Sequence, residues 1–262
     1  MGFMLGNTSK TRGLIKPGSL IGGKYRVIKL VGEGGVAYVY EAEHIHTNRV
    51  VAIKILKPAV AELHPKLREK FAKEPYQTPD DPGIVKVLDA GIDESTGMPF
   101  LVMELYPQNL RDLLKEKIAK ELLLDILVEV AEIMARVHEQ YNLIHLDLKP
   151  ENIFVDKDGK VKIGDFGFAR LKAETFSKSS IWGTPVYTAP EVWDGEFSEK
   201  SDVYSLGIIL AEILTGRPYS KNITNPTLRK LVEQATSLDP HERPTTTQFT
   251  QILKQHLQPM LT

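Results

Sequence analysis

The sequence predicts an α+β fold of two lobes, a strand-rich N-lobe followed by a mainly helical C-lobe. Residues 25–30 alternate apolar and polar side chains as half-buried strands do, and residues 50–56 form an apolar run of strand length. Over residues 122–137 apolar side chains recur every three or four positions, as in a long amphipathic helix. Such a division favours a ligand cleft between the lobes. The expected boundaries are a flexible arm over 1–24, an N-lobe over 25–106 and a C-lobe over 107–262.

The composition excludes several classes of protein. The 262 residues are 42% hydrophobic and 26% charged, as in an ordinary globular protein, and the formal net charge of -1 gives no support for binding nucleic acid or an anionic membrane. The chain contains no cysteine, which excludes disulfides, thiolate metal sites and cysteine nucleophiles. No apolar run approaches the length of a membrane span or a signal sequence. We therefore expect a cytoplasmic protein.

A glycine-rich turn follows the first predicted strand. Residues 32–35 are Gly-Glu-Gly-Gly, and extended character resumes over residues 36–41. Hairpins use the same residues, so this turn alone is weak evidence for a ligand site. In the next predicted strand, residues 50–56, Lys54 stands among apolar side chains. A buried lysine is costly unless it is paired, so Lys54 is either functional or lies on an edge strand and reaches solvent.

A short helix is predicted over residues 65–74, where a proline suits the first turn and Leu67 and Phe71 are four positions apart. Pro75 follows directly. Proline inside a helix costs about 3 kcal/mol, because it removes a backbone donor and clashes with the preceding turn. We therefore expect this helix to end near Glu74. The remaining strands expected in the N-lobe are 84–88 and 100–103.

Chemically active residue types concentrate in one stretch of the predicted C-lobe. Asp147, Lys149 and Asn152 lie within six residues of one another, and Asp165 comes later in the sequence. Between Asn152 and Asp165, two short apolar runs flank an Asp-Gly turn, which predicts a two-stranded hairpin over residues 153–163. That hairpin would bring Asn152 and Asp165 together. A carboxylate and an amide oxygen beside a lysine suit Mg²⁺ and a polyphosphate, whereas the alternative is a polar loop in an ordinary α/β protein.

Several motifs, in order, resemble those of the eukaryotic-type (Hanks-type) serine/threonine protein kinases, and the compact length resembles bacterial members of that family. HLDLKPEN at residues 145–152 resembles the catalytic loop, and DFG at 165–167 resembles the metal-binding motif. The VAIK motif that ends at Lys54, the glycine-rich turn before it and GTPVYTAPE at 183–191 also match. The resemblance covers residues 25–257 and implies the two-lobed protein-kinase fold with an ATP cleft.

The resemblance implies roles for the residues of the catalytic loop. Asp147 would accept the proton of the substrate hydroxyl, and Lys149 would neutralise charge on the transferred phosphate. Asn152 and Asp165 would hold Mg²⁺ against the phosphates of ATP. Thr184 would bond to Asp147 and Lys149, which is a mark of the serine/threonine-directed members.

The resemblance also implies a nucleotide site. Lys54 would contact the α- and β-phosphates and pair with Glu74, with Glu69 as the alternative partner. The third glycine of the family's phosphate-covering loop is Ala37 in this chain. The implied nucleotide-binding residues, besides Lys54, are Val31, Gly32, Gly34, Ala37, Val39, Ala52, Met103, Glu104, Tyr106 and Phe154.

Two departures from the family pattern concern regulation. Leu146 stands where most members have an arginine that receives a phosphorylated residue of the activation loop, and leucine cannot do so. Pro75 shortens the helix that supplies Glu74, so we expect the Lys54–Glu74 pair to depend on ATP or on a regulatory protein at this helix. The activation-loop residues open to phosphorylation are Thr175, Ser177, Ser179 and Ser180. Structural pairing is expected between Glu191 and Arg243, and Asp202 is expected to cap a helix or brace the catalytic loop.

The predicted function is an ATP- and Mg²⁺-dependent protein serine/threonine kinase that also autophosphorylates. The first alternative is a pseudokinase that binds nucleotide as a scaffold, which Ala37 and Pro75 keep open. The second is a kinase fold acting on a small molecule, which the segment 183–191 disfavours because it is a protein-kinase feature. The expected partner is a protein substrate with serine or threonine, and no nucleic acid or membrane.

Overall fold

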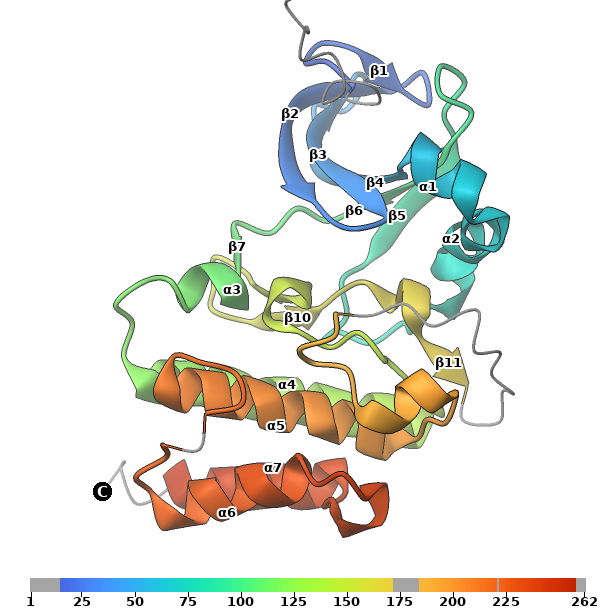
Figure 1. Ribbon diagram of the computed structural model, residues 1–262. Helices are drawn as coiled ribbons and strands as arrows, with labels where there is room; N and C mark the ends of the chain where they lie inside the picture. The colour runs from blue at the N-terminus through green and yellow to red at the C-terminus, as the bar shows by residue number, and fades with distance from the viewer. Residues whose placement is uncertain (1–14, 172–183, 221, 258–262) are drawn as a thin grey trace, which may run out of the picture. The chain divides into compact units, whose positions relative to one another are not determined.

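A computed structural model of the protein describes residues 15–171, 184–220 and 222–257 (Figure 1). The chain separates into two compact units. The first comprises the chain up to Tyr76 together with Lys86–Leu105, and the second comprises Gln77–Val85 and the chain from Tyr106 onward. The short segment Gln77–Val85, expected in the strand-rich lobe, therefore belongs to the helical unit.

The first unit is built on an antiparallel sheet with the strand order β1-β2-β3-β4-β6-β5. The strands are β1 Leu20–Ile21, β2 Tyr25–Glu33, β3 Ala37–His44, β4 Val50–Leu56, β5 Val87–Ile92 and β6 Pro99–Met103. The strands predicted around residues 25–30, 36–41, 50–56 and 100–103 are confirmed. The strand predicted from residue 84 begins only at Val87, because Ile84 instead forms an isolated bridge with Ile163 of the second unit.

Alternation along the strands places one set of apolar side chains in a common core. This core comprises Ile21, Tyr25, Val27, Tyr40, Ala42, Val51, Ile53, Ile55, Phe100 and Val102. Lys54 has the opposite parity on β4 and pairs in register with Val39 of β3 and Leu101 of β6. Since β4 is an interior strand, the alternative that Lys54 reaches solvent from a sheet edge is wrong.

The prediction of a flexible arm over residues 1–24 is wrong for Leu20–Ile21 and the residues next to them. Leu20–Ile21 pairs with β2, and the Ile21 side chain is fully buried. The Gly22 amide donates to the carboxylate of Asp93 at 3.1 Å, and a Cβ on Gly22 would stand 2.4 Å from the ring of Phe100. Gly22, which lies in the arm expected to be flexible, is thus needed for close packing against the sheet. Residues 1–14 lie outside the described part of the chain.

Two helices follow β4, namely α1 Pro58–Leu63 and α2 Pro65–Gln77. Helix α2 begins where predicted, but it continues beyond Glu74 through Pro75 to Gln77, so the predicted end is wrong. A proline inside a helix removes one backbone hydrogen bond, at a cost of about 3 kcal/mol. Burial of Leu67 and Phe71 stabilises the helix by about 1.5–3 kcal/mol each. Tertiary packing therefore offsets the local cost.

The second unit is mainly helical. Its helices are α3 Leu110–Leu113, α4 Lys120–Gln140, α5 Glu199–Thr215, α6 Pro226–Ala235 and α7 Thr246–Leu257. Its strands are β7 Gln108–Asn109, β8 Leu143–Ile144, β9 Ile153–Val155, β10 Val161–Ile163 and β11 Arg170–Leu171, and short 3-10 helices include η1 Pro150–Asn152, η2 Phe166–Phe168, η4 Pro190–Asp194 and η5 Pro240–Glu242. The predicted amphipathic helix over 122–137 is confirmed as α4.

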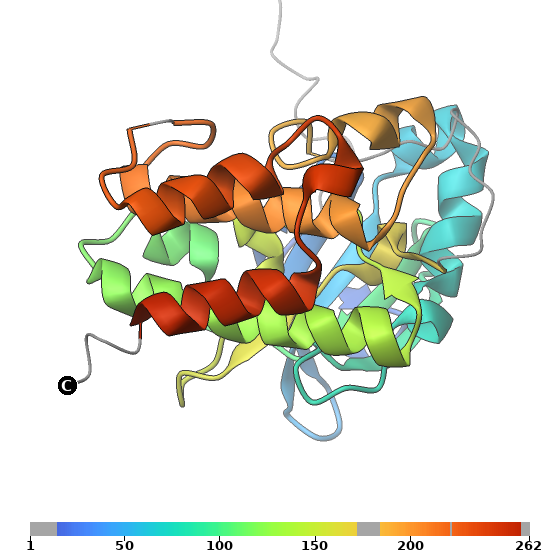
Figure 2. The ribbon, with the colours of Figure 1, turned by 90° about the horizontal axis from the view of Figure 1, so that it is seen from below.

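Helix α5 is the centre of this unit. It packs on α4 and α6, and α7 packs on α4 and α6 in turn, as the view from below shows (Figure 2). Residues 201–213 of α5 are all buried, because the helix is apolar nearly all round. A capping box between Ser198 and Ser201 begins the helix, and Gly216 ends it in the left-handed conformation with φ 74°. The predicted capping role of Asp202 is therefore wrong, and its carboxylate is available for another contact.

Candidate active site

The backbone of the catalytic loop, residues 145–152, is fixed by Asp202. The amide of His145 donates to Oδ2 of Asp202 at 2.8 Å, and the amide of Leu146 donates to Oδ1 at 2.9 Å. Leu146 has φ 66°, a left-handed conformation that is strained for a leucine by about 1–3 kcal/mol. The buried carboxylate thus holds a turn that the chain would otherwise avoid, directly before Asp147. The predicted brace on the catalytic loop is confirmed.

A buried histidine supports this carboxylate. Burial by itself would raise the pKa of Asp202, but the hydrogen bond with His138, at 2.8 Å, and the backbone amide of His145 lower it below the ordinary value. The other ring nitrogen of His138 lies 2.9 Å from Oγ1 of Thr246 at the start of α7. Since an ionised carboxylate only accepts hydrogen bonds, Nε2 of His138 is the donor. Three helices, α4, α5 and α7, therefore meet at one polar chain that ends on the catalytic loop.

Asp147, Lys149 and Thr184 are brought into direct contact. Nζ of Lys149 donates to Oδ2 of Asp147 at 2.7 Å and to Oγ1 of Thr184 at 2.8 Å. The amide and the hydroxyl of Thr184 both donate to Oδ1 of Asp147, at 3.2 and 3.3 Å. Burial raises the pKa of Asp147 above its ordinary value, an effect that Lys149 opposes and Asp165 reinforces. The predicted contacts are therefore present, between residues as far as 37 positions apart.

The predicted hairpin brings Asn152 beside the 165–167 motif. Strands β9 and β10 pair in register, and the amide of Gly164 donates to the carbonyl of Asn152 at 2.9 Å. The side-chain nitrogen of Asn152 donates to the carbonyl of Asp147 at 2.8 Å, which orients the amide group. Asp165 has φ 65° and ψ 62°, so this residue also adopts a left-handed conformation.

The oxygen donors of Asn152 and Asp165 suit magnesium. Asn152 contributes an amide oxygen and Asp165 a carboxylate, and Mg²⁺ prefers oxygen ligands, usually one or two from the protein with the rest from water and phosphate. Within the described ranges no group of three or more Asp, Glu, His or Cys side chains forms a metal site. The two residues therefore fit a metal that a phosphorylated ligand and water would complete.

His145 has a structural position rather than a catalytic one. Its ring lies 4.7 Å from the ring of Phe166, centroid to centroid. Nδ1 accepts the amide of Asp147 at 3.2 Å, and Nε2 lies 3.0 Å from the carbonyl of Gly164. One ring nitrogen accepts a hydrogen bond and the other donates one, so both nitrogens of His145 are engaged in linking the catalytic loop to the hairpin.

In the first unit, Lys54 and Glu74 form a buried ion pair. Nζ of Lys54 lies 3.0 and 3.2 Å from the two carboxylate oxygens of Glu74, and their side chains are only 7% and 2% exposed. Nζ also lies 5.2 Å from the centroid of the Phe71 ring. Glu69, the alternative partner, is exposed on α2. The expectation that the pair needs ATP or another protein is not supported, since α2 is packed well enough to hold Glu74 in place.

The glycine-rich turn has no structural need for its glycines. Gly32 and Gly34 do not adopt positive φ, and added Cβ atoms would meet Val39 at 3.5 Å and the carbonyl of Ala37 at 3.7 Å, which are ordinary contacts. The amide of Gly34 donates to that carbonyl at 3.0 Å and closes the turn. The fold itself therefore does not require glycine at positions 32 and 34.

The other predicted nucleotide residues are divided between the units. Val31, two residues before the end of β2, is 45% exposed, whereas Ala52 of β4 is buried and pairs with Met103 of β6. Glu104 follows Met103 in the same unit. Tyr106 and Phe154 belong to the second unit, where their ring centroids are 5.8 Å apart.

The expected pair of Glu191 and Arg243 is present. The guanidinium donates to both carboxylate oxygens at 2.7 and 2.9 Å, and the Arg243 side chain is fully buried. Burial would raise the pKa of Glu191, but the hydrogen bonds from Arg243 and Ser201 lower it. The pair anchors the segment that begins at Thr184.

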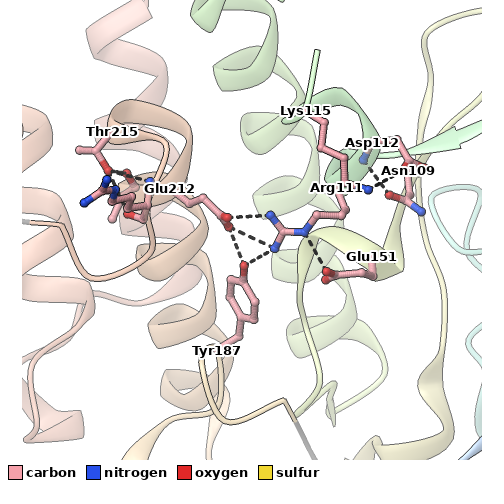
Figure 3. A network of polar contacts seen from close by, with 10 residues as sticks. Asn109, Arg111, Asp112, Lys115, Glu151, Tyr187, Glu212 and Thr215 are labelled. Atoms are coloured by element: carbon pink, nitrogen blue, oxygen red, sulfur yellow. Dashed lines mark hydrogen bonds and ion pairs between the residues drawn. The ribbon is translucent and has the colours of Figure 1, made fainter. Parts of the chain in front are cut away.

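The sequence motifs did not indicate His138 and Arg111, which both support this site. His138 carries no motif signal. Arg111 on α3 bonds to Glu151, Tyr187 and Glu212, partners that lie 40 to 101 positions away (Figure 3). No local pattern reveals ion pairs over such separations. The phosphorylation candidates Thr175, Ser177, Ser179 and Ser180 lie outside the described residues.

The fold and the geometry of residues 145–167 and 184–191 define a protein kinase domain. Residues 25–258 match the family model described as "Protein kinase domain", and the chain belongs to that family. It is 37% identical over 212 residues to the serine/threonine-protein kinase PrkC of Bacillus subtilis, covering 76% of this chain and 32% of that protein. It is 35% identical over 207 residues to the serine/threonine-protein kinase PknB of Mycolicibacterium smegmatis, covering 74% of this chain and 33% of that protein.

The chain thus spans about a third of the length of these curated relatives. Across the helices that the structure describes, none combines the length and the apolar character needed to cross a membrane.

Proposed function

We propose that this chain is an ATP-dependent protein serine/threonine kinase, which transfers the γ-phosphate to hydroxyl groups of protein substrates and also autophosphorylates. The contact of Asp147, Lys149 and Thr184 carries the proposal. A base, a cation and the threonine of the activation segment meet there at hydrogen-bond distance. Phosphoryl transfer needs positioning and neutralisation of charge more than covalent chemistry, and this cluster supplies both.

Each residue has a defined part in the proposed reaction. Asp147 orients the substrate hydroxyl and accepts its proton, for which a pKa above the ordinary aspartate value is favourable. Lys149 lies against Asp147 and would neutralise the transferred phosphoryl group. Thr184 keeps the two side chains in register. Lys54, held by Glu74, would bind the phosphates of ATP.

Asn152 and Asp165 would hold the metal, which we propose is Mg²⁺. Bound magnesium supplies neutralisation of phosphate charge. The support is the donor set of one amide oxygen and one carboxylate, and the hydrogen bond from Asn152 to the carbonyl of Asp147 that orients the amide. Because that bond joins the proposed metal ligand to the proposed base, both would be placed together.

Two finer proposals concern the setting of the enzyme. We propose a cytoplasmic location, on the ground of a cysteine-free, near-neutral composition. A regulatory protein at α2 is a proposal from the sequence. The exposed residues Lys66, Arg68 and Glu69 on that helix are compatible with it, whereas the closed Lys54–Glu74 pair makes it unnecessary for forming the ion pair.

One experiment separates the kinase from the pseudokinase. Purified protein is incubated with labelled ATP and Mg²⁺, with and without a generic basic-protein substrate, beside an Asp147→Asn control. We expect label in the substrate and in the enzyme with the wild-type chain alone. No transfer above the control, with nucleotide still bound, would instead establish a nucleotide-binding pseudokinase.

A further inference from the structure

One arginine joins three separate segments of the second unit. Arg111 on α3 donates from Nε to Glu151 at 2.8 Å, from one terminal nitrogen to Glu212 at 2.6 Å, and from the other to the hydroxyl of Tyr187 at 2.5 Å (Figure 3). The Tyr187 hydroxyl itself donates to Glu212 at 2.5 Å. The guanidinium thus uses donors in all directions of its plane, an arrangement that a lysine could not reproduce.

The network is charged and partly buried. The exposed fraction of the side chain is 9% for Glu212, 23% for Arg111 and 44% for Glu151. Burial disfavours the charged guanidinium, but the hydrogen bonds to Glu212 and Glu151 raise the pKa of Arg111 above its ordinary value. Burial and Glu212 likewise raise the pKa of Tyr187, so its hydroxyl stays protonated and donates. Arg111 therefore stays charged and Tyr187 stays a hydrogen-bond donor at neutral pH.

Two of the three partners are close in sequence to the catalytic contact. Glu151 lies in η1, between Lys149 and Asn152. Tyr187 is three positions after Thr184, and its amide donates to the Thr184 carbonyl at 2.9 Å in a tight turn. The third partner, Glu212, lies on the buried helix α5, which gives the network a rigid base.

We propose that Arg111 is a positioning residue for phosphoryl transfer. By binding Glu151 and Tyr187 at once, it fixes the distance between the catalytic loop and the turn that carries Thr184, and so keeps Thr184 against Asp147 and Lys149. Arg111 touches neither Asp147 nor Thr184 in any described contact, so it acts through its partners. The inference rests on the proposed kinase function and adds a determinant of its rate.

The test compares Arg111→Gln with Arg136→Gln. Arg136 is the matched control because it forms a similar two-bond pair with Asp81, at 2.9 and 3.0 Å, in the same unit and with no described bond to residues 145–152 or 184–191. Initial rates are measured at varied peptide and ATP concentrations, and amide hydrogen exchange is followed across residues 184–192. Arg111→Lys, which keeps the charge but not the planar fork, and Tyr187→Phe, which removes only the hydroxyl, complete the set.

We expect Arg111→Gln to lower kcat by roughly 10- to 100-fold with an unchanged KM for ATP, since small misplacements of reacting groups cost rates of that order. Arg111→Lys and Tyr187→Phe should fall between it and the wild type, Arg136→Gln should keep the wild-type kcat, and exchange over residues 184–192 should rise only in the Arg111 and Tyr187 variants. If Arg111→Gln fails to fold, the same comparison is made with Tyr187→Phe.

Two results would overturn the inference. One is a loss of kcat that Arg136→Gln shares in proportion to its loss of thermal stability. The other is faster turnover of arginine-containing peptides by Arg111→Gln, because Glu151 and Glu212 would then be a substrate subsite that Arg111 merely fills. A wild-type chain without transfer activity refutes the proposed function separately, and the exchange measurement then still decides whether Arg111 orders residues 184–192.

Discussion

Asp202 holds the backbone of Leu146 in a left-handed conformation. The amide of Leu146 donates to the Asp202 carboxylate at 2.9 Å across a separation of 56 positions, and its φ is 66°. The same carboxylate accepts the amide of His145 and the ring of His138. The central helix α5 thus determines the shape of the turn that precedes the proposed base.

Removal of this carboxylate should be severe. Asp202→Ala leaves two buried backbone amides and a buried histidine without their acceptor, and we expect a loss of about 3–5 kcal/mol in the free energy of unfolding. Urea unfolding monitored by fluorescence measures it. Asp158→Ala, at an exposed position in the β9–β10 turn, is the control and should change stability by less than about 0.5 kcal/mol. Equal urea midpoints for Asp202→Ala and Asp158→Ala would show that Asp202 does not stabilise the turn at Leu146.

We expect Asp147 to lower the stability of the folded protein at neutral pH. Burial raises its pKa in the folded state, with opposition from Lys149 and reinforcement from Asp165. A carboxyl group with a raised folded pKa favours folding fully below its unfolded pKa of about 3.9 and loses that contribution as pH rises through the folded pKa. At neutral pH, Asp147→Asn should therefore be more stable than the wild type. The difference should shrink as pH falls towards about 4.

Thermal unfolding of the wild type and Asp147→Asn at a series of pH values tests this. Asp158→Asn, at an exposed turn position, serves as the control and should follow the wild type at each pH. A wild type that is the more stable protein at neutral pH would contradict the prediction.

The Lys54–Glu74 pair should show strong coupling. Either Lys54→Met or Glu74→Leu alone removes from a buried charge its partner in this ion pair, with an expected loss of about 3–5 kcal/mol. The double variant removes both charges, so it should be more stable than at least one single variant. Chemical unfolding of the four proteins completes the cycle, with Glu69→Leu on the exposed face of α2 as the control. Additive losses in the double variant would mean that the two side chains do not interact in solution.

Phosphorylation of the activation loop should matter little. Leu146 is apolar and buried, so it offers no cation to a phosphate group. We expect the combined alanine variant at Thr175, Ser177, Ser179 and Ser180 to retain most of its transfer rate to a generic substrate. Steady-state assays of phosphatase-treated wild type and variant measure it. A collapse of the rate in the alanine variant alone would refute the prediction.

The local sequence was sufficient to predict elements whose residue pattern repeats every few positions. Alternation located the strands around residues 25–30 and 50–56, and apolar periodicity located α4. The Asp-Gly turn predicted the β9–β10 hairpin and hence the approach of Asn152 to the 165–167 motif. Motif order then led to the family and to its paired residues, such as Glu191 and Arg243.

Local rules failed where distant packing outweighed them. Pro75 did not end α2, because burial of Leu67 and Phe71 is comparable in energy to the cost of one proline in a last turn. Gly22 lies in the arm expected to be flexible, yet it packs against Phe100. In both cases the local preference is real, and contacts far along the chain exceed it.

The types and the order of the proposed catalytic residues are determined by the sequence alone, because short motifs fix which groups stand near one another along the chain. The family resemblance indicated the brace by Asp202, but only the tertiary structure decided what else supports these residues: His138 behind that carboxylate, and Arg111 between Glu151 and Tyr187. Hydrogen bonds and ion pairs between residues 40 or more positions apart leave no periodic trace, since they depend on which helix faces which loop after the core has formed. The completeness of the Lys54–Glu74 pair was decided in the same way, by the packing of α2 rather than by its proline.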